Sequence, residues 1–392
     1  MAITIPDTLS VYLHIPFCGV KCSYCAFNTY TSLDHLIAPF VDALVEEIRC
    51  VGQGAHGYLV HTVFLGGGTP SLLSSEQIRA ILEALHTHFR LSATAEVTME
   101  ANPVDLSRDY CAAVKAVGIN RMSIGMQSAN EAELRLFDRR HDNDAVIRAV
   151  QSARHGGIRN LNLDLIYGAP HQTMESWQAT LRQTLVLQPE HVSLYALSLE
   201  AGTAMRSWVE RGKLPTPDDD LAADMYDLAT EMLGAEGYVQ YEISNWCKPG
   251  RECLHNLQYW YNHDYVGLGP GAHGFAAGVR YHVLRSPVRY IELMSTPPSG
   301  DLVFPRTPAT EEAHIVERDD LIAETLIMGM RLTQAGIDRA DFRRRFGVDL
   351  LEVHGEPIAR HQRSGLLTVD DERVRLTERG RMLSNIVLRD FV

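Results

Sequence analysis

The feature that most restricts the possible folds of this chain is a regular alternation of short apolar, β-branched runs with segments of helical periodicity. In one such segment Leu36, Phe40, Leu44 and Ile48 recur every four residues, so their side chains share one helix face. Strand, helix and strand at this spacing predict right-handed βαβ units and a parallel sheet. The six expected strands are Val11–Ile15, Thr62–Leu65, Glu96–Glu100, Arg121–Gly125, Asn160–Tyr167 and His191–Ser198.

Six units are two fewer than a closed eight-stranded barrel contains, so we predict an α/β fold with a partial, open (β/α)6 barrel over residues 1–200. An aromatic-rich extension of the barrel follows over 201–294, and a Pro/Ser/Thr-rich stretch predicts a linker over 295–312. Helical patterns and a strand–turn–strand around Asp370 predict a small winged-helix-like domain over 313–392. Its nearly balanced charges favour a packing or lid role over DNA binding.

Three closely spaced cysteines, Cys18, Cys22 and Cys25, form a C-x3-C-x2-C motif directly after the first expected strand. Three thiolates can bind a four-iron cluster and leave one iron without a protein ligand. A structural zinc site would need a fourth ligand, for which His14 and Cys50 are candidates. Disulfides would need an oxidising compartment. The motif therefore predicts an iron–sulfur cluster with one open iron.

Composition and charge exclude several classes of function. Of the 392 residues 45% are hydrophobic, as in ordinary globular proteins, and the formal net charge of −13 argues against broad contact with nucleic acid. No run of about 18 apolar residues predicts a membrane span, and the first residues lack the basic region and apolar core of a secretion signal. Seven cysteines, an odd number, suit a reducing compartment. We therefore expect a cytoplasmic protein.

Polar and glycine-rich motifs follow most of the expected strands at their C-terminal ends, where barrels of this kind collect binding residues. Taken alone, a glycine run predicts only a turn, and Glu100 could be a surface carboxylate. Asp164 is harder to explain as structural, because a carboxylate inside an apolar parallel strand is unfavourable unless it is paired or faces a polar site. The motifs are Gly66–Pro70, Glu100–Pro103, Gly125–Ser128, Tyr167-Gly168 and Ala196.

S-adenosylmethionine suits such a site, because its amino and carboxylate groups can chelate an open iron and the cluster can supply the electron that cleaves a carbon–sulfur bond. A glycine backbone can approach the amino group closely. Arg139 can pair with the carboxylate, although beside Arg140 it could instead belong to a solvated charged face. The ribose hydroxyls or the positive end would be held by Glu100, Gln127 and Asp164, and the adenine by Ile166 and the backbone at Ala196.

A second group of residues, in the segment CLHNLQYWYNHDY, surrounds His255 with aromatic side chains. A histidine can ligate haem iron while aromatic rings pack on the macrocycle. On residue chemistry alone a hydrogen-bonded core histidine is the more frequent case. Cys247 and Cys253 are alternative haem ligands nearby. The segment Gly269–Gly274 has the form G-x-G-x-x-G, but Pro270 within it and the missing strand-to-helix context predict a loop.

The motifs YLHIPFCGVKCSYCAFN, VFLGGGTPSLL, MEANP, SIGMQS, NLNLDLIYGAP and YEISNW…HNLQYW…GLGPGAHG together resemble the HemW branch of the radical S-adenosylmethionine superfamily. This branch is related to oxygen-independent coproporphyrinogen III dehydrogenase. The resemblance runs from about Val11 to the C-terminus and implies a [4Fe-4S] cluster on the three cysteines and an accessory C-terminal domain. It implies S-adenosylmethionine contacts at Tyr12, Gly67, Gly68, Thr69, Glu100, Gln127, Arg139, Asp164, Ile166 and Ala196.

Two departures separate this chain from the dehydrogenase, whose motif has a further cysteine where Phe27 stands here and whose long N-terminal extension is missing, since 17 residues precede Cys18. Both features are similar to HemW, regarded as a chaperone that binds haem and delivers it to haem-dependent respiratory proteins such as cytochromes. The resemblance makes His255 the expected haem contact, and any membrane association would be peripheral, through these partners. The alternative is a radical enzyme: the dehydrogenase, or a related methyltransferase or cyclopropanase.

Overall fold

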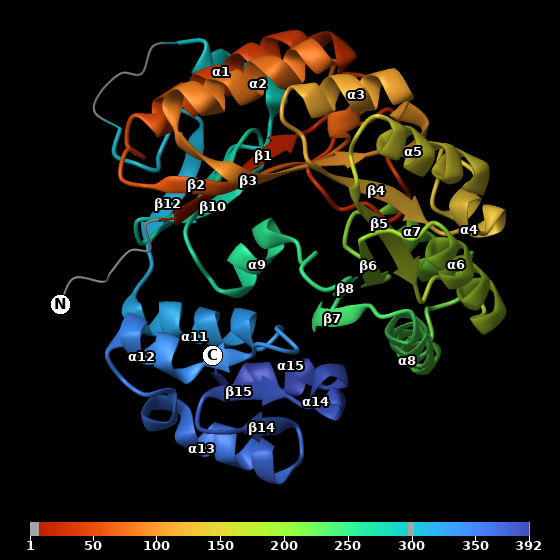
Figure 1. Ribbon diagram of the computed structural model, residues 1–392, viewed down its shortest axis with the longest axis vertical. Coiled ribbons are helices and arrows are strands. Elements are labelled where there is room, and N and C mark those ends of the chain that lie inside the picture. The colour runs from red at the N-terminus through yellow and green to blue at the C-terminus, as the bar shows by residue number, and fades with distance from the viewer. Residues whose placement is uncertain (1–7, 297–301, 392) are drawn as a thin grey trace.

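The computed structural model describes residues 8–296 and 302–391, and its main feature is one curved, twelve-stranded sheet (Figure 1). Its centre consists of six consecutive parallel strands, so the partial (β/α)6 barrel expected from the sequence is confirmed. The parallel pairing follows from the helical crossover between successive strands. The six strands are β1 (Thr8–Ile15), β2 (Leu59–Gly67), β3 (Arg90–Ala101), β4 (Arg121–Gln127), β5 (Asn160–Tyr167) and β6 (His191–Ala196).

Additional strands extend the sheet at both edges. β9 (Tyr265–Leu268) pairs parallel with β1, and β10 (His273–Ala276), β11 (Val279–Val283) and β12 (Thr310–Ile315) continue from it antiparallel. At the other edge β8 (Asn245–Cys247) pairs antiparallel with β6, and β7 (Val239–Glu242) pairs with β8. The extension expected over residues 201–294 therefore supplies strands to both sides of the barrel.

The linker expected over residues 295–312 is shorter than the sequence suggested. Residues 310–312 already belong to β12, where His282 of β11 pairs with Glu312. The hydrogen-bonding groups of β11 would otherwise form an open edge, and β12 covers them. Within the expected linker, residues 297–301 lie outside the described residues.

Helices cover the outer, convex face of the sheet (Figure 1). Phe40, Leu44 and Ile48 are all buried on one face of the first helix, whereas Leu36 is the N-cap residue just before it. Ser74 with Gln77 forms the expected capping box. The outer helices are α1 (Ile37–Gly52), α2 (Ser75–His88), α3 (Arg108–Ala116), α4 (Glu131–Leu136), α5 (Asn143–His155) and α6 (Met174–Val186). Short 3-10 turns lie at Asp34–Leu36, Pro70–Leu72, Pro103–Asp105 and Arg389–Phe391.

The inner face of the barrel is polar, whereas the outer face of the same strands is apolar. Side chains alternate along a strand, so Leu161, Leu163 and Leu165 of β5 enter the apolar core under the helices. Asn162 and Asp164 of the same strand face the interior. A closed barrel of this type is usually filled by branched apolar side chains. The open barrel instead has an interior suited to polar ligands.

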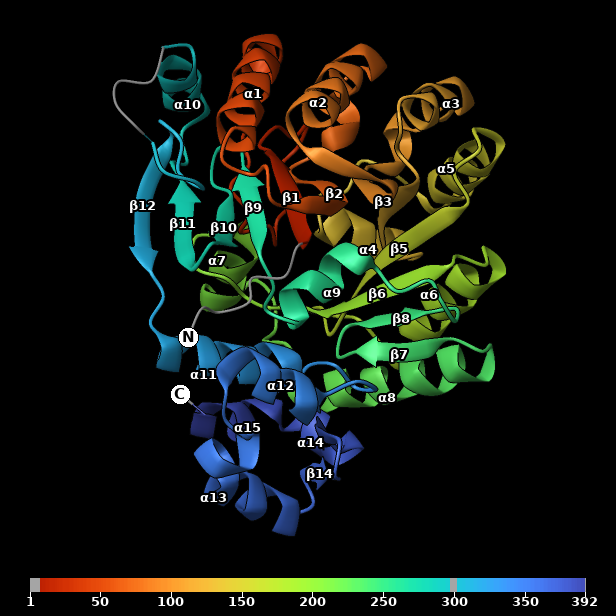
Figure 2. The same cartoon turned by 60° about the vertical axis from the view of Figure 1, so that its left-hand side comes forward.

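The helix α9 (Leu254–Trp260), which contains His255, lies on the concave side of the sheet between the barrel and the C-terminal domain (Figure 2). It packs against β2 and against the first helix of that domain. The remaining helices of the extension are α7 (Ala204–Glu210), α8 (Asp219–Ala235) and α10 (Pro287–Met294).

The C-terminal domain has its own apolar core, which includes Leu326, Phe342 and Val374. The strand–turn–strand expected around Asp370 is confirmed, and a third short strand completes a small sheet in the order β13–β15–β14. No helix within the described residues is long and apolar enough to cross a membrane. The elements are α11 (Arg318–Gly329), β13 (Ile337–Asp338), α12 (Arg339–Phe346), α13 (Leu350–Arg363), β14 (Leu367–Val369), β15 (Arg373–Leu376), α14 (Glu378–Met382) and α15 (Ser384–Leu388).

Candidate cofactor site

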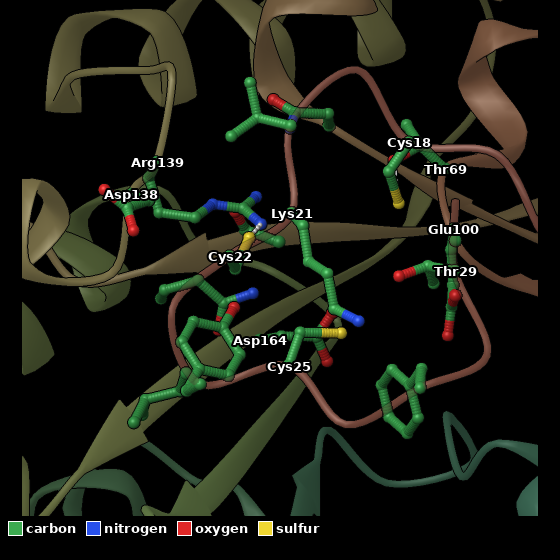
Figure 3. Close-up of a pocket in the computed structure, with 18 of the residues that line it drawn as sticks. Cys18, Lys21, Cys22, Cys25, Thr29, Thr69, Glu100, Asp138, Arg139 and Asp164 are labelled. Carbon is green, nitrogen blue, oxygen red and sulfur yellow. Dashed lines mark hydrogen bonds between the residues drawn. The ribbon is translucent and has the colours of Figure 1, made fainter. Parts of the chain in front are cut away.

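The three cysteines lie in the loop between β1 and α1, at the C-terminal end of the first strand. Two backbone hydrogen bonds shape this loop: Cys18 N–H donates to the Tyr30 carbonyl at 3.0 Å, and Cys25 N–H donates to the Cys22 carbonyl at 3.1 Å. Figure 3 shows the three sulfur atoms directed into one pocket. The loop thus presents its thiols together at the end of the barrel where binding residues were expected.

The chemistry of these thiols fits a cluster better than a zinc ion. All seven cysteines are free thiols. His14, one candidate fourth zinc ligand, has both ring nitrogens engaged, with Tyr12 Oη at 3.0 Å and the Asn28 carbonyl at 2.9 Å. The other, Cys50, lies in α1 beside Glu46. Within residues 8–296 and 302–391 no three His, Cys, Asp or Glu side chains converge on a single ion. A [4Fe-4S] cluster places each thiolate on a different iron.

Polar groups stand next to two of the sulfurs. Thr69 Oγ1 donates to Cys18 Sγ at 3.4 Å, and Arg139 Nη1 lies 3.5 Å from Cys22 Sγ. Burial raises the pKa of both the Cys18 and Cys25 thiols. A positive ion bound by the thiols lowers their pKa again, because the thiolate is the ligand form.

The Gly66–Pro70 turn supports the cysteine loop directly. Gly68 N–H donates to the Ile15 carbonyl and Thr69 N–H to the Phe17 carbonyl, both at 2.8 Å. A Cβ on Gly68 would lie 2.5 Å from the Phe17 oxygen and 2.6 Å from the Ile15 oxygen, closer than real Cβ contacts. Gly67 has φ +104°, a conformation that favours glycine. Both glycines are therefore required for the two loops to meet.

Two carboxyl groups of the barrel strands line the pocket: Glu100, next to the end of β3, and Asp164, within β5. Glu100 Oε2 accepts from Gly67 N–H at 2.9 Å, and burial together with repulsion from Asp164 raises the pKa of Glu100 to about 8. Asp164 accepts from Ser123 Oγ and Asn162 Nδ2, each at 2.8 Å. Burial raises its pKa, and these hydrogen bonds oppose that rise. The pair therefore differs in its environment, with the negative charge better supported on Asp164.

Gln127 and Arg139 form another side of the pocket. Gln127 has φ 65°, an uncommon value for a residue other than glycine, and β4 and β5 change register at this point. Arg139 Nη2 donates to the Gly125 carbonyl at 2.8 Å, which fixes its guanidinium over the end of β4. Arg139 is thus a pocket residue and not part of a solvated charged face.

The pocket has a volume of about 400 Å3, within the range of roughly 300–1,000 Å3 typical of small-molecule sites. All of the S-adenosylmethionine contacts expected from the resemblance line it, together with the three cysteines, except Tyr12. Tyr12 lines a smaller cavity beneath, next to Glu100. Ile166 and Ala196 lie on the pocket wall at the ends of β5 and β6, as expected for an adenine contact.

His255 is placed differently from what a haem ligand requires. Its side chain is 1% exposed, Nδ1 lies 2.8 Å from Thr62 Oγ1, and Nε2 lies 2.9 Å from Tyr259 Oη. Burial lowers its pKa to about 3, so the ring is neutral. The adjoining cavity of about 120 Å3 is far below the roughly 300 Å3 of pockets that enclose drug-sized ligands. In this conformation His255 is a hydrogen-bonded core residue.

The alternative haem ligands differ in access. Cys247 and Cys253 are both buried, whereas His273, at the start of β10, is exposed. Within the segment Gly269–Gly274, residues 269–272 form the expected loop and join β9 to β10, whereas His273 and Gly274 are the first residues of β10.

Sequence reasoning missed the residues that connect this loop to the cysteine loop. Asn28 Nδ2 donates to the Pro270 carbonyl at 2.8 Å, and Gly269 N–H donates to the fully buried Glu47 of α1 at 2.7 Å. The glycines of the loop were visible in the sequence, but they were interpreted without a structural partner. The loop between β9 and β10 is therefore hydrogen-bonded to the cysteine loop through Asn28.

Comparison with known proteins agrees with this architecture. Residues 12–184 match the Radical SAM superfamily, and residues 316–383 match the HemN C-terminal domain. Among solved structures, coproporphyrinogen III oxidase (HemN) from Escherichia coli superposes with a TM-score of 0.84 at 24% identity, over 99% of this chain and 91% of the other. At that identity the likeness establishes the fold.

Sequence relatives establish the family. Two proteins called heme chaperone HemW, from Mycobacterium tuberculosis and Escherichia coli K12, are 37% and 36% identical to this chain. The first alignment covers 97% of this chain and 94% of the relative, and the second covers 98% of both. A mouse protein, radical S-adenosyl methionine domain-containing protein 1, mitochondrial, is 37% identical over 84% of this chain and 74% of its own length. The chain therefore belongs to the HemW family of the radical S-adenosylmethionine superfamily, for which a [4Fe-4S] cluster and S-adenosylmethionine are the implied cofactors.

Proposed function

We propose that this protein is a haem chaperone that carries a [4Fe-4S] cluster and S-adenosylmethionine. The observation that supports it most is the nearly full-length similarity, at 33–37% identity, to bacterial proteins called heme chaperone HemW. Phe27, 68% exposed at the mouth of the pocket, adds to this. It stands where the related dehydrogenase has a further cysteine.

In the proposed cofactor site each group has one role. Cys18, Cys22 and Cys25 hold the cluster, which leaves one iron for the amino and carboxylate groups of S-adenosylmethionine. Arg139 pairs with the carboxylate, and its fixed position above β4 suits that role. Glu100 and Asp164 hold the ribose hydroxyls of the cofactor or face its positively charged sulfonium. When bound, the cluster supplies an electron to the cofactor.

For haem binding by this chain we propose two candidate ligands, His255 and His273. His255 would have to break its hydrogen bond with Thr62 or with Tyr259 to reach an iron. His273 needs no such change, because it is exposed. The recipients that suit the proposed function are haem-dependent respiratory proteins of the cytoplasmic side, with any membrane contact made through them.

The test is an anaerobic haem titration of the cluster-reconstituted protein, followed at the Soret band. Wild type, His255→Ala and His273→Ala are compared, with the exposed surface residue His155 replaced by alanine as a control. Saturable binding by the wild type supports the chaperone, and the variant that weakens it identifies the ligand. Absence of saturable haem binding in the wild type refutes it. In that case substrate-dependent formation of 5′-deoxyadenosine would identify a radical enzyme.

A further inference from the structure

A small polar cavity of about 120 Å3 adjoins the cofactor pocket inside the barrel. The two spaces share a wall, because both are lined by Glu100, Ser123 and Asp164. From the other side α9 closes the cavity with His255 and Tyr259. A buried water needs roughly 10–15 Å3 and two or more polar partners, so this cavity can hold several waters.

Arg121, the first residue of β4, extends into this cavity from the opposite end. It is 2% exposed, and its Nε has no hydrogen-bond partner within residues 8–296 and 302–391. Burial opposes its charge, but the carboxyl groups of Glu96 and Asp164 around it raise the pKa of Arg121, so it remains a cation. A buried cation of this kind is unfavourable unless nearby anions or water compensate it.

Of the carboxyl groups of Glu100 and Asp164, that of Asp164 is the one whose ionised form the charge of Arg121 stabilises. Its two oxygens are fixed by Ser123 and Asn162, and Asn162 Oδ1 in turn faces His191 Nδ1 at 2.7 Å. Arg121 acts on Asp164 in the same direction as these hydrogen bonds, toward the ionised form. Glu100 lacks such support, since among the residues that the structure describes only Gly67 N–H donates to it.

We propose that Arg121 is a positioning residue for S-adenosylmethionine: through the waters of this cavity its charge keeps Asp164 ionised beneath the bound cofactor. Of the two neighbouring carboxyl groups, Glu100 is then the one that carries a proton in the free site. The inference rests on the proposed cofactor site, but it concerns a residue that does not touch the cofactor itself.

Apart from Glu100, whose pKa burial and Asp164 raise to about 8, the following titratable groups around Arg121 and Asp164 keep one charge state between pH 5.5 and 8. Burial lowers the pKa of His191 and that of His255, which falls to about 3, so both imidazoles stay neutral. Burial raises the pKa of Cys253 to about 12. It also raises the pKa of the phenols Tyr12, Tyr195, Tyr241 and Tyr259, which line or border the cavity from β1, β6, β7 and α9.

Glu96 of β3 is the other carboxyl group near Arg121. Its Oε1 accepts from the backbone N–H of His255 at 3.1 Å, on the side of the cavity away from the cofactor pocket. Arg121 therefore interacts with two carboxyl groups: Glu96, which accepts a hydrogen bond from α9, and Asp164, which faces the cofactor pocket.

The experiment measures the dissociation constant of S-adenosylmethionine for the anaerobic, cluster-reconstituted protein by calorimetry from pH 5.5 to 9. At each pH the dissociation constant for Arg121→Gln is divided by that for the wild type, so that the titration of the ligand itself cancels. We expect a ratio of at least tenfold at pH 6 that falls toward one by pH 9, because a higher pH ionises Asp164 without help. One pKa unit corresponds to a factor of ten. Arg121→Lys, which keeps a charge, should show a smaller ratio near neutral pH.

If the ratio of dissociation constants is the same at every pH, whether it equals one or is larger, the proposal is overturned. An arginine with a merely structural role would change binding by a factor that does not depend on the ionisation of Asp164. Should Arg121→Gln fail to hold the cluster, Asp164→Asn decides. Asp164→Asn is then measured in a Glu100→Gln background, which removes the carboxyl group whose pKa Asp164 raises. With Asp164 ionised throughout, the ratio of the double variant to Glu100→Gln is constant between pH 5.5 and 8; a ratio that approaches one at pH 6 overturns the inference. Wild-type protein that does not bind S-adenosylmethionine at all would instead contradict the cofactor site.

Discussion

The binding of S-adenosylmethionine should depend on pH through Glu100. Burial and repulsion from Asp164 raise the pKa of Glu100 to about 8 in the free site. The group is therefore protonated below pH 8 and ionised above it. The cofactor carries a positive sulfonium, so it binds more tightly to the ionised site. Below pH 8 binding has to release that proton, which weakens it by up to a factor of ten for each pH unit.

The perturbation is Glu100→Gln, a neutral group of the same shape. Its dissociation constant divided by that of the wild type should be near one at pH 6, rise between about pH 7 and 8, and then level off. A hydrogen bond to a charged group contributes about 1.5–3 kcal/mol, so the plateau should be tenfold or more. The assay is anaerobic calorimetry on the cluster-reconstituted protein.

The control is Glu83→Gln, on the exposed surface of α2, which should bind as the wild type does at every pH. A ratio for Glu100→Gln that does not change between pH 6 and 9 would refute the reasoning. It would mean that Glu100 is ionised throughout, as an exposed glutamate is, or that it does not contact the cofactor.

Three further outcomes follow from the packing of the site. Gly68→Ala should abolish cluster assembly as completely as Cys22→Ser, because its Cβ would lie 2.5 and 2.6 Å from two backbone oxygens. The measurement is the iron and sulfide content. The control Gly234→Ala should retain the full cluster, because no neighbouring atom of the described residues lies within 4 Å of its Cβ. Arg139→Ala should weaken S-adenosylmethionine binding at least tenfold, and unchanged affinity by calorimetry would remove it from the site. Glu47→Ala should cost about 3 kcal/mol or more in urea unfolding, because the backbone N–H of Gly269 and two hydroxyl groups lose their buried acceptor; a change below 1 kcal/mol would contradict this.

The sequence alone determined the features that depend on local or periodic patterns. Six strand-like runs with helices between them can pack only as parallel βαβ units, because the helices must cross over between strands. Cysteine spacing within eight residues identifies the cluster loop, since the ligands are covalently close. The capping box at Ser74 and the strand–turn–strand at Asp370 are likewise contained in a few consecutive residues.

Only the tertiary structure decided which residues share the barrel interior. Arg121, Asp164 and His255 come from three separate elements, and the register between strands brings them to one cavity. The sequence alone gives no sign that Arg121 is buried, and it leaves His255 either a hydrogen-bonded core residue or a haem contact. Burial places Arg121 inside the barrel, and burial together with the partners of both ring nitrogens makes His255 a core residue in this structure. Those partners lie up to 193 residues away, as for His255 and Thr62, beyond any local pattern.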